Sequence, residues 1–246
     1  MGLFSKKSCS ICGGEIGLLG NRKLEDGNCC KDCAKKLSPF FSERRHSTVD
    51  SIKEQLAYRE ANQAVVEAFN PTLVLGNYTK VMIDEGKRQF IVTSASKWRD
   101  TNPDVLSFAD VTGCDIKVNE YKTENRTTDK DGNSVSYNPP RFTYNYDFDE
   151  IIHVNNPYFD EIRVPIDDFS VEDGPFGSAP TQSAKYINAS NTANEIKERI
   201  MNNRQDARDN AAKEAAPKTP VTCKCCGATT IPDAFGRCEY CGSSAI

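Results

Sequence analysis

Hydrophobic residues recur at a helical period in two parts of the chain. The first, residues 49–69, has Asp50 near its start as a candidate N-cap and is followed by Asn70-Pro71, which ends a helix. The second begins at the capping box Thr192-Ala193-Asn194-Glu195 and continues to about residue 213. The pattern predicts a connecting helix and a long amphipathic helix. Their apolar positions are Ile52, Leu56, Val65 and Phe69 in the first and Ala193, Ile196, Ile200 and Ala207 in the second.

Between the helices, polar and apolar residues alternate over short runs, as in half-buried β-strands. Turn sequences such as Asp84-Glu85-Gly86-Lys87 separate the runs, and no helical segment intervenes. Asp129 to Ser134 imitates a calcium loop, but its glycine is misplaced and no glutamate closes it, so a hairpin tip is expected. Short strands at hairpin spacing predict an antiparallel sheet. The expected strands are 72–75, 78–84, 89–93, 105–108, 111–121, 142–148, 151–154 and 161–166.

Antiparallel strands followed by one amphipathic helix resemble a pleckstrin-homology or GRAM-type barrel, whose helix plugs one open end. The resemblance implies an α+β protein with a PH/GRAM-like barrel plus long helix over residues 71–214. Residues 43–70 would form the connecting helix that precedes the barrel. After the barrel, residues 215–220 contain two prolines and are expected to form a semi-rigid linker.

Eleven cysteines and two histidines add a chemistry that the hydrophobic pattern does not show. Cys9, Cys12, Cys30 and Cys33 have the spacing C-x2-C-x17-C-x2-C, which is typical of a four-cysteine zinc site. A short hairpin turning near Gly20-Asn21 is expected between the pairs, and a helix should carry the last two cysteines. Cys29 is a competing ligand to Cys30, although the x2 spacing favours Cys30. The order of knuckle, hairpin and helix resembles a treble-clef finger over residues 1–42.

The second cysteine group lies in residues 221–246 and repeats the form C-x2-C-G. Two such knuckles are the signature of a zinc ribbon, with Ile231 or Phe235 expected to cover the site. Cys225 and Cys114 stand outside the two sets of ligands. The expected ligands of the ribbon are Cys223, Cys226, Cys238 and Cys241.

Zinc is favoured over disulfides, because the cysteine count is odd and no segment has the layout of a signal peptide. Iron–sulfur clusters are a weaker reading, since a small four-thiolate shell is typical of structural zinc. We therefore expect two Zn²⁺ ions per chain. Four protein ligands leave no coordination position for water, so both ions are expected to be structural.

No arrangement of catalytic residues can be identified. His46 and His153 belong to no metal or triad motif, and Cys114 is expected to be a buried strand residue and not a nucleophile. Asp147, Asp149 and Glu150 could form an acid–base set, but alternation is expected to put the two aspartates on one exposed face. Phosphate-binding and nucleophile-elbow motifs are absent from the sequence. We expect no enzymatic activity and no catalytic or cofactor-binding residues.

The whole layout resembles an uncharacterised family of bacterial and phage proteins. Its members have an N-terminal four-cysteine finger, a barrel-like middle and sometimes a C-terminal ribbon. The resemblance implies this architecture and metal binding, but no activity.

Charge separates two functional hypotheses. Residues 1–48 carry a net charge of +4 and residues 71–173 a net charge of −8, within a total of −4. This balance favours a cytoplasmic scaffold or adaptor that docks other proteins through its fingers and acidic β domain, and no segment is apolar enough to span a membrane. The alternative is a regulator that binds nucleic acid or an anionic membrane surface. It would use Arg22, Lys23, Lys31, Lys35, Lys36, Arg44 and Arg45.

Overall fold

The computed structural model describes residues 7–167, 171–173, 181–215, 220–232 and 236–245. The chain divides into two compact units, Met1–Gln205 and Asp206–Ile246. The division falls inside the long helix α3 (Ala184–Ala215).

The first unit begins with a small finger. Strand β1 (Lys7–Ser8) pairs with β2 (Glu15–Ile16), β3 (Arg22–Lys23) pairs with β4 (Asn28–Cys29), and α1 (Lys31–Ala34) follows. The hairpin expected near Gly20-Asn21 is therefore wrong, because residues 22–23 pair across the Asp26-Gly27 turn instead. Gly27 is required there, since a Cβ would lie 2.6 Å from Val49 Cγ2.

Helix α2 (Val49–Ala68) connects the finger to the first sheet. Thr48, and not Asp50, is its N-cap: Thr48 has extended backbone and its side chain accepts a hydrogen bond from Ser51 N. A short 3₁₀ helix, Glu43–His46, precedes it. Ile52 near the start of α2 is buried in the core of the finger, whereas Val66 near its end packs in a cluster with the first sheet.

The first sheet has four antiparallel strands in sequence order. Its middle strands, β6 and β7, are buried on both faces. Met82 and Ile91 lie in one cluster with Val66, Phe69 and Trp98, and the ring of Phe69 meets the ring of Trp98 edge-on at 5.8 Å. The strands are β5 (Leu73–Leu75), β6 (Lys80–Asp84), β7 (Gln89–Thr93) and β8 (Leu106–Ser107), with 3₁₀ turns at Trp98–Thr101 and Phe108–Asp110.

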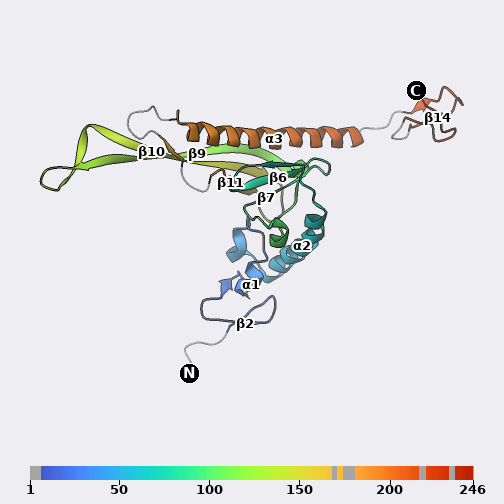
Figure 1. The fold of residues 1–246 in the computed structure, drawn as a ribbon. Coiled ribbons are helices and arrows are strands. Elements are labelled where there is room, and N and C mark those ends of the chain that lie inside the picture. Colours follow the sequence, from blue (N-terminus) through green and yellow to red (C-terminus); the bar gives the residue numbers. More distant parts are fainter. Residues whose placement is uncertain (1–6, 168–170, 174–180, 216–219, 233–235, 246) are drawn as a thin grey trace. The chain divides into compact units, whose positions relative to one another are not determined.

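The second sheet is dominated by one long hairpin, β9 (Val111–Thr128) and β10 (Ser134–Val154). The far edge of β10 pairs with β11 (Glu161–Pro165) and β12 (Val171–Asp173). Beyond β11 the hairpin extends away from the rest of the sheet (Figure 1). Its tip is the turn expected at Asp129 to Ser134, with Asp129 Oδ1 accepting hydrogen bonds from Asp131 N and Asn133 N.

The expected closed barrel is wrong. The two four-stranded sheets are open, and among the described residues their edge strands do not pair with one another. The cause is the length of β9 and β10: the segments 111–121, 142–148 and 151–154 are not separate short strands that return around a barrel. They belong to two continuous strands that run outward together.

Helix α3 covers a face of the second sheet instead of plugging a barrel (Figure 1). Tyr186 meets Tyr146 and Phe148 edge-on, at 4.8 and 5.0 Å between ring centroids. The helix begins eight residues before Thr192, because Ser183 Oγ accepts a hydrogen bond from Tyr186 N and caps an earlier start. Its buried residues in the first unit are Ala189, Ala193, Ile196 and Ile200.

The second unit contains a two-stranded sheet, β13 (Val221–Thr222) and β14 (Thr229–Thr230), and a bridge between Arg237 and Ser244. Its core consists of Cys223, Cys238 and Ala245, with Val221 packed against them. Ile231 is 45% exposed and is not part of this core. Phe235 and most of the linker 215–220 lie outside the described residues.

Candidate metal centres

The fold of the finger brings Cys9, Cys12, Cys30 and Cys33 together, with all four sulfur atoms within 4.8 Å of one another. Cys9 Sγ lies 3.9 Å from Cys33 Sγ, and Cys12 Sγ lies 3.8 Å from Cys30 Sγ. A tetrahedral zinc ion with Zn–S bonds of about 2.3 Å holds its sulfur ligands about 3.8 Å apart. The cluster therefore has the dimensions of a four-thiolate zinc module.

The second unit contains a matching cluster of Cys223, Cys226, Cys238 and Cys241. The sulfur–sulfur distances Cys223–Cys241 and Cys226–Cys238 are both 3.7 Å. All eleven cysteines are free, and these distances far exceed the roughly 2.05 Å of a disulfide bond. Each of the two clusters could hold one metal ion.

Three of the four cysteine pairs share one backbone geometry. In each C-x2-C-G knuckle, the glycine N–H donates to the carbonyl of the first cysteine at 2.8–2.9 Å. Gly13, Gly227 and Gly242 have φ angles of 74°, 72° and 70°, a left-handed conformation that disfavours other residues. The fourth pair differs, because Cys30 is the N-cap of α1 and its sulfur accepts a hydrogen bond from Cys33 N.

Backbone N–H groups adjust the acidity of the thiols. Burial raises the pKa of Cys9, but hydrogen bonds from the backbone of Cys12, Cys30 and Ile11 outweigh it and lower the pKa to about 6. Cys30 N lies 3.2 Å from Cys9 Sγ. Burial and the neighbouring thiols raise the pKa of Cys33. In the second cluster, a hydrogen bond from the backbone of Ser243 lowers the pKa of Cys241.

The three remaining cysteines lie in different surroundings. Cys29 was the alternative to Cys30, but it is outside the four-sulfur cluster and fully buried in the core of the finger, where burial raises its pKa to about 11. Cys225 is exposed. Cys114 is buried, as expected, and its thiol donates to Glu150 Oε1 at 2.9 Å, which together with burial raises its pKa.

The acidic residues of β10 are placed differently from the sequence prediction. Asp149 is buried and forms an ion pair with Arg163 at 2.6 Å, so its expected exposure is wrong. The reason is that both faces of β10 are covered where β11 pairs with it. His153 Nε2 lies 3.4 Å from Asp115 Oδ2, while His46 is exposed on the 3₁₀ helix.

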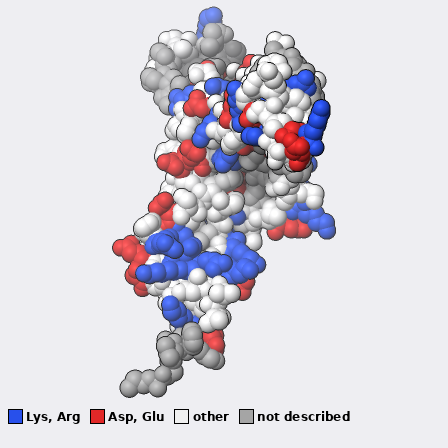
Figure 2. All heavy atoms as spheres, turned by 90° about the vertical axis from the view of Figure 1, so that its left-hand side faces the viewer, with Lys and Arg blue, Asp and Glu red and all other residues white. Residues whose placement is uncertain are grey.

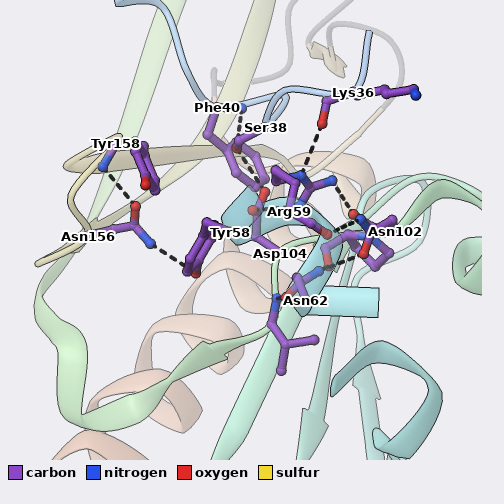
Figure 3. Close-up of polar contacts among 12 residues, drawn as sticks. Lys36, Ser38, Phe40, Tyr58, Arg59, Asn62, Asn102, Asp104, Asn156 and Tyr158 are labelled. Atoms are coloured by element: carbon purple, nitrogen blue, oxygen red, sulfur yellow. Dashed lines mark hydrogen bonds and ion pairs between the residues drawn. The ribbon is translucent and has the colours of Figure 1, made fainter. Parts of the chain in front are cut away.

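A buried ion pair joins the finger to the first sheet (Figure 3). Arg59 on α2 donates to Asp104 Oδ1 at 2.6 Å, and Ser38, which follows α1, donates to Asp104 Oδ2 at 2.8 Å. Arg59 also donates to the carbonyl oxygens of Lys36 and Asn102. The side chains of Arg59 and Asp104 are 6% and 0% exposed. This network could not be predicted from the sequence, because an arginine on a predicted helix gives no indication of its partner 45 residues later.

Asn62 extends the same network one helical turn further along α2. Its Nδ2 donates to Asn102 Oδ1 and to the carbonyl of Pro103, both at 2.7 Å, and its Oδ1 accepts a hydrogen bond from Val105 N. Asn102 returns a hydrogen bond to the carbonyl of Arg59. The buried side chains of Arg59 and Asn62 therefore hold residues 102–105 against α2 (Figure 3).

Lys and Arg side chains gather over the finger (Figure 2). Two of the seven cations named from the sequence have structural contacts: Arg44 Nη1 donates to the carbonyl of Lys23 at 2.6 Å, and Arg22 Nη1 to that of Leu19 at 3.3 Å. A hollow of about 660 Å³ between α1 and α2 is lined in part by basic side chains. The exposed members of these seven are Lys23, Lys31, Lys35, Lys36 and Arg45.

A second hollow, of about 840 Å³, lies between residues 39–43 and the segment that joins β10 to β11. The rings of Phe40 and Phe159 meet there at 5.4 Å. Three carboxylates and one cation also line the hollow: Glu43, Asp160, Glu161 and Arg163. It therefore combines an aromatic wall with a mainly acidic rim.

Comparison with known proteins gives one result. Residues 7–55 match the model of a family described as a domain of unknown function, DUF4428. No curated protein and no solved structure matches the chain. Among the described residues, no helix is long and apolar enough to cross a membrane. The finger is thus similar to the DUF4428 domain, and the match spans all four cysteines of the first cluster.

Proposed function

We propose that the chain is a non-enzymatic scaffold or adaptor that carries two structural Zn²⁺ ions and docks other proteins. The observation that supports zinc most directly is the spacing of sulfur atoms at 3.7–3.9 Å in both clusters. Four thiolates would fill the coordination shell of each ion, so neither ion would have a position for substrate or water. The ligands would be Cys9, Cys12, Cys30 and Cys33 in the finger and Cys223, Cys226, Cys238 and Cys241 in the ribbon.

Elemental analysis of protein purified without added metal tests the identity and the number of the bound ions. We expect about two Zn per chain, and about one in either Cys12→Ser or Cys226→Ser, because three thiolates hold structural zinc poorly. Cys225→Ser is the matched control, since Cys225 lies between two proposed ligands without being in the cluster, and it should keep two. Iron, or no metal in the wild-type chain, would contradict the proposal.

The hollow beside Phe40 is the surface that best supports docking of a protein. Its aromatic wall offers apolar area, and its carboxylates favour a segment that carries Lys or Arg. Residues 71–173, which include most of this rim, have a net charge of −8. The expected partner is therefore a protein with a basic, partly apolar segment.

Affinity purification from the native host tests this partner class. The wild-type chain should retain a protein that the doubly reversed variant Asp160→Lys/Glu161→Lys does not. The control variant Lys97→Glu/Lys185→Glu reverses the same number of charges at exposed sites away from the hollow. It should still retain the partner protein. Equal recovery with all three chains would rule out the hollow as the docking surface.

The second candidate function is binding to nucleic acid or to an anionic membrane surface. The exposed lysines over the finger favour it (Figure 2), whereas the net charge of −4 does not. Retention on heparin at low salt that is lost as salt rises would support this function, and flow-through would support the scaffold. Lys35→Ala/Lys36→Ala should weaken any retention, because both side chains are exposed on the finger.

A further inference from the structure

The outer part of the β9–β10 hairpin lacks the packing that normally stabilises a sheet. No residue from Asp115 to Asn145 is buried, although both strands are regular over most of this stretch. Beyond β11 and β12 the hairpin consists of two strands only. Such a ribbon is marginally stable in water. The segment therefore lacks a further layer or a further strand.

The edge of β9 is the side on which a strand could be added. Residues 113–128 of β9 pair without interruption with β10, and their other edge has no strand partner among the described residues. The irregularity of the hairpin lies on the opposite strand, where residues 137–140 are looped out between Ser136 and Arg141 and include two prolines. β9 has neither proline nor bulge in 114–128, so it lacks two of the common devices that protect an edge.

We propose that β9 pairs with β9 of a second copy of this chain, antiparallel and about a two-fold axis at Thr123. In a two-fold antiparallel pair one residue faces its own copy, and residues equally distant from it on either side face each other. With Thr123 on the axis, Lys122 faces Glu124 of the second copy and Glu120 faces Arg126 of the second copy. Just beyond, Lys117 faces Asp129 of the second copy.

The charge pattern selects this register over its neighbours. With the axis at Lys122 or Glu124, like charges face each other: Glu120 meets Glu124, or Lys122 meets Arg126. With the axis at Tyr121 or Asn125, only one type of opposite-charge pair remains within the strand. Cross-strand pairs of opposite charge stabilise a sheet and like pairs destabilise it. The alternation Glu120, Lys122, Glu124, Arg126 is therefore complementary to itself about Thr123.

The same register is centred on the outer part of the free edge. Thr123 is the midpoint of residues 118–128, the part of β9 that lies beyond the level of β11. Pairing about Thr123 covers this whole segment. It stops before the base of β9, where Arg204 Nε on α3 donates to the carbonyl of Val111 and Lys197 lies 3.8 Å from Asp115. One strand pair is a small interface, so we expect an affinity in the micromolar range.

Sedimentation of the full chain as purified, from about 1 to about 100 μM, tests the dimer. The wild type should move from monomer to dimer over this range. Lys122→Glu and Glu124→Lys should each weaken dimerisation at least about tenfold, because either change places like charges opposite each other at two symmetry-related positions. Lys97→Glu, the same charge change at an exposed site outside the hairpin, should dimerise as the wild type does.

An equimolar mixture of the two hairpin variants separates pairing from misfolding. In the mixed dimer, two carboxylates of the K122E chain face two ammonium groups of the E124K chain, so the mixture should dimerise although neither variant does alone. A wild-type chain that stays monomeric overturns the proposal, as does a single variant with unchanged affinity. A mixture that stays monomeric overturns the register. Because metal content does not enter this readout, the result is independent of the proposed zinc function.

Discussion

Glu150 is an ionisable residue with unusually few partners. It lies on β10 with its carboxyl fully buried. One oxygen accepts a hydrogen bond from the Cys114 thiol, and the other has no hydrogen-bond partner among the described residues. Burial, with a smaller contribution from Asp115, raises the pKa of Glu150 from 4.5 to about 7, although Cys114 and Lys197 act in the opposite direction. The carboxyl is therefore held largely protonated in the folded chain at mildly acidic pH.

This burial makes folding stability depend on pH. Because the folded pKa lies above the unfolded one, the contribution is fully present below about pH 4.5 and is lost as pH rises towards about 7. The total change is on the order of 3 kcal/mol. Glu150→Gln should remove this slope from denaturant unfolding measured between pH 5 and 8. Glu161→Gln, at an exposed carboxyl on β11, should leave the slope as in the wild type, and an unchanged slope in E150Q would contradict the assignment.

Element boundaries show where sequence patterns were sufficient. The helix at 49–69 and both cysteine clusters were predicted from periodicity and spacing, since these depend on neighbours in sequence. The start of α3 was not, because Ser183 and Thr192 both offer a cap and only packing of Tyr186 on Phe148 favours the earlier one. The length of β9 and β10 was also missed. The outer residues of β9, 122–128, are all polar, so no alternation marks them as strand, and Pro139-Pro140 interrupts the outer part of β10.

Helix α3 should depend on a few apolar residues. Ile196 is fully buried, whereas Ile187 on the same helix is 46% exposed. Ile196→Ala should lower the free energy of unfolding by about 2–5 kcal/mol, because it opens a cavity between helix and sheet. Ile187→Ala should change it by less than about 0.5 kcal/mol. Equal effects in chemical denaturation would mean that α3 does not pack through this face.

At the scale of the molecule, the two cysteine clusters differ in what they are attached to. The finger shares α2 with the first sheet, through Ile52 at one end and through Arg59 and Val66 further along. The core of the second unit is limited to Cys223, Cys238, Ala245 and Val221. Loss of metal from the finger should therefore reach the sheet, whereas loss from the ribbon should stay local. The finger is therefore not an appendage that folds independently of the middle of the chain, whereas the ribbon is expected to be one.

Trp98, the single tryptophan, reports this difference because it packs against Phe69 at the end of α2. Cys9→Ser should lower the thermal midpoint of Trp98 fluorescence by more than about 5 °C, since the loss of several kcal/mol shifts a chain of this size by about that much. Cys223→Ser should lower it by less than about 2 °C and expose the C-terminal residues to protease. A shift in Cys9→Ser as small as that expected for Cys223→Ser would show that the finger is not coupled to the sheet.

The position of Arg59 also bears on how this finger could be moved between proteins. The stretch similar to DUF4428 ends at residue 55, in the middle of α2 and before Arg59. A graft cut at that boundary would end the helix early, and it would leave the carbonyl of Lys36 and the hydroxyl of Ser38 without the partners that hold them here. A graft that continues through Val105 would include both Arg59 and Asp104, the two residues of the buried ion pair. The segment recognisable in sequence is thus shorter than the segment a protein engineer would need to transfer.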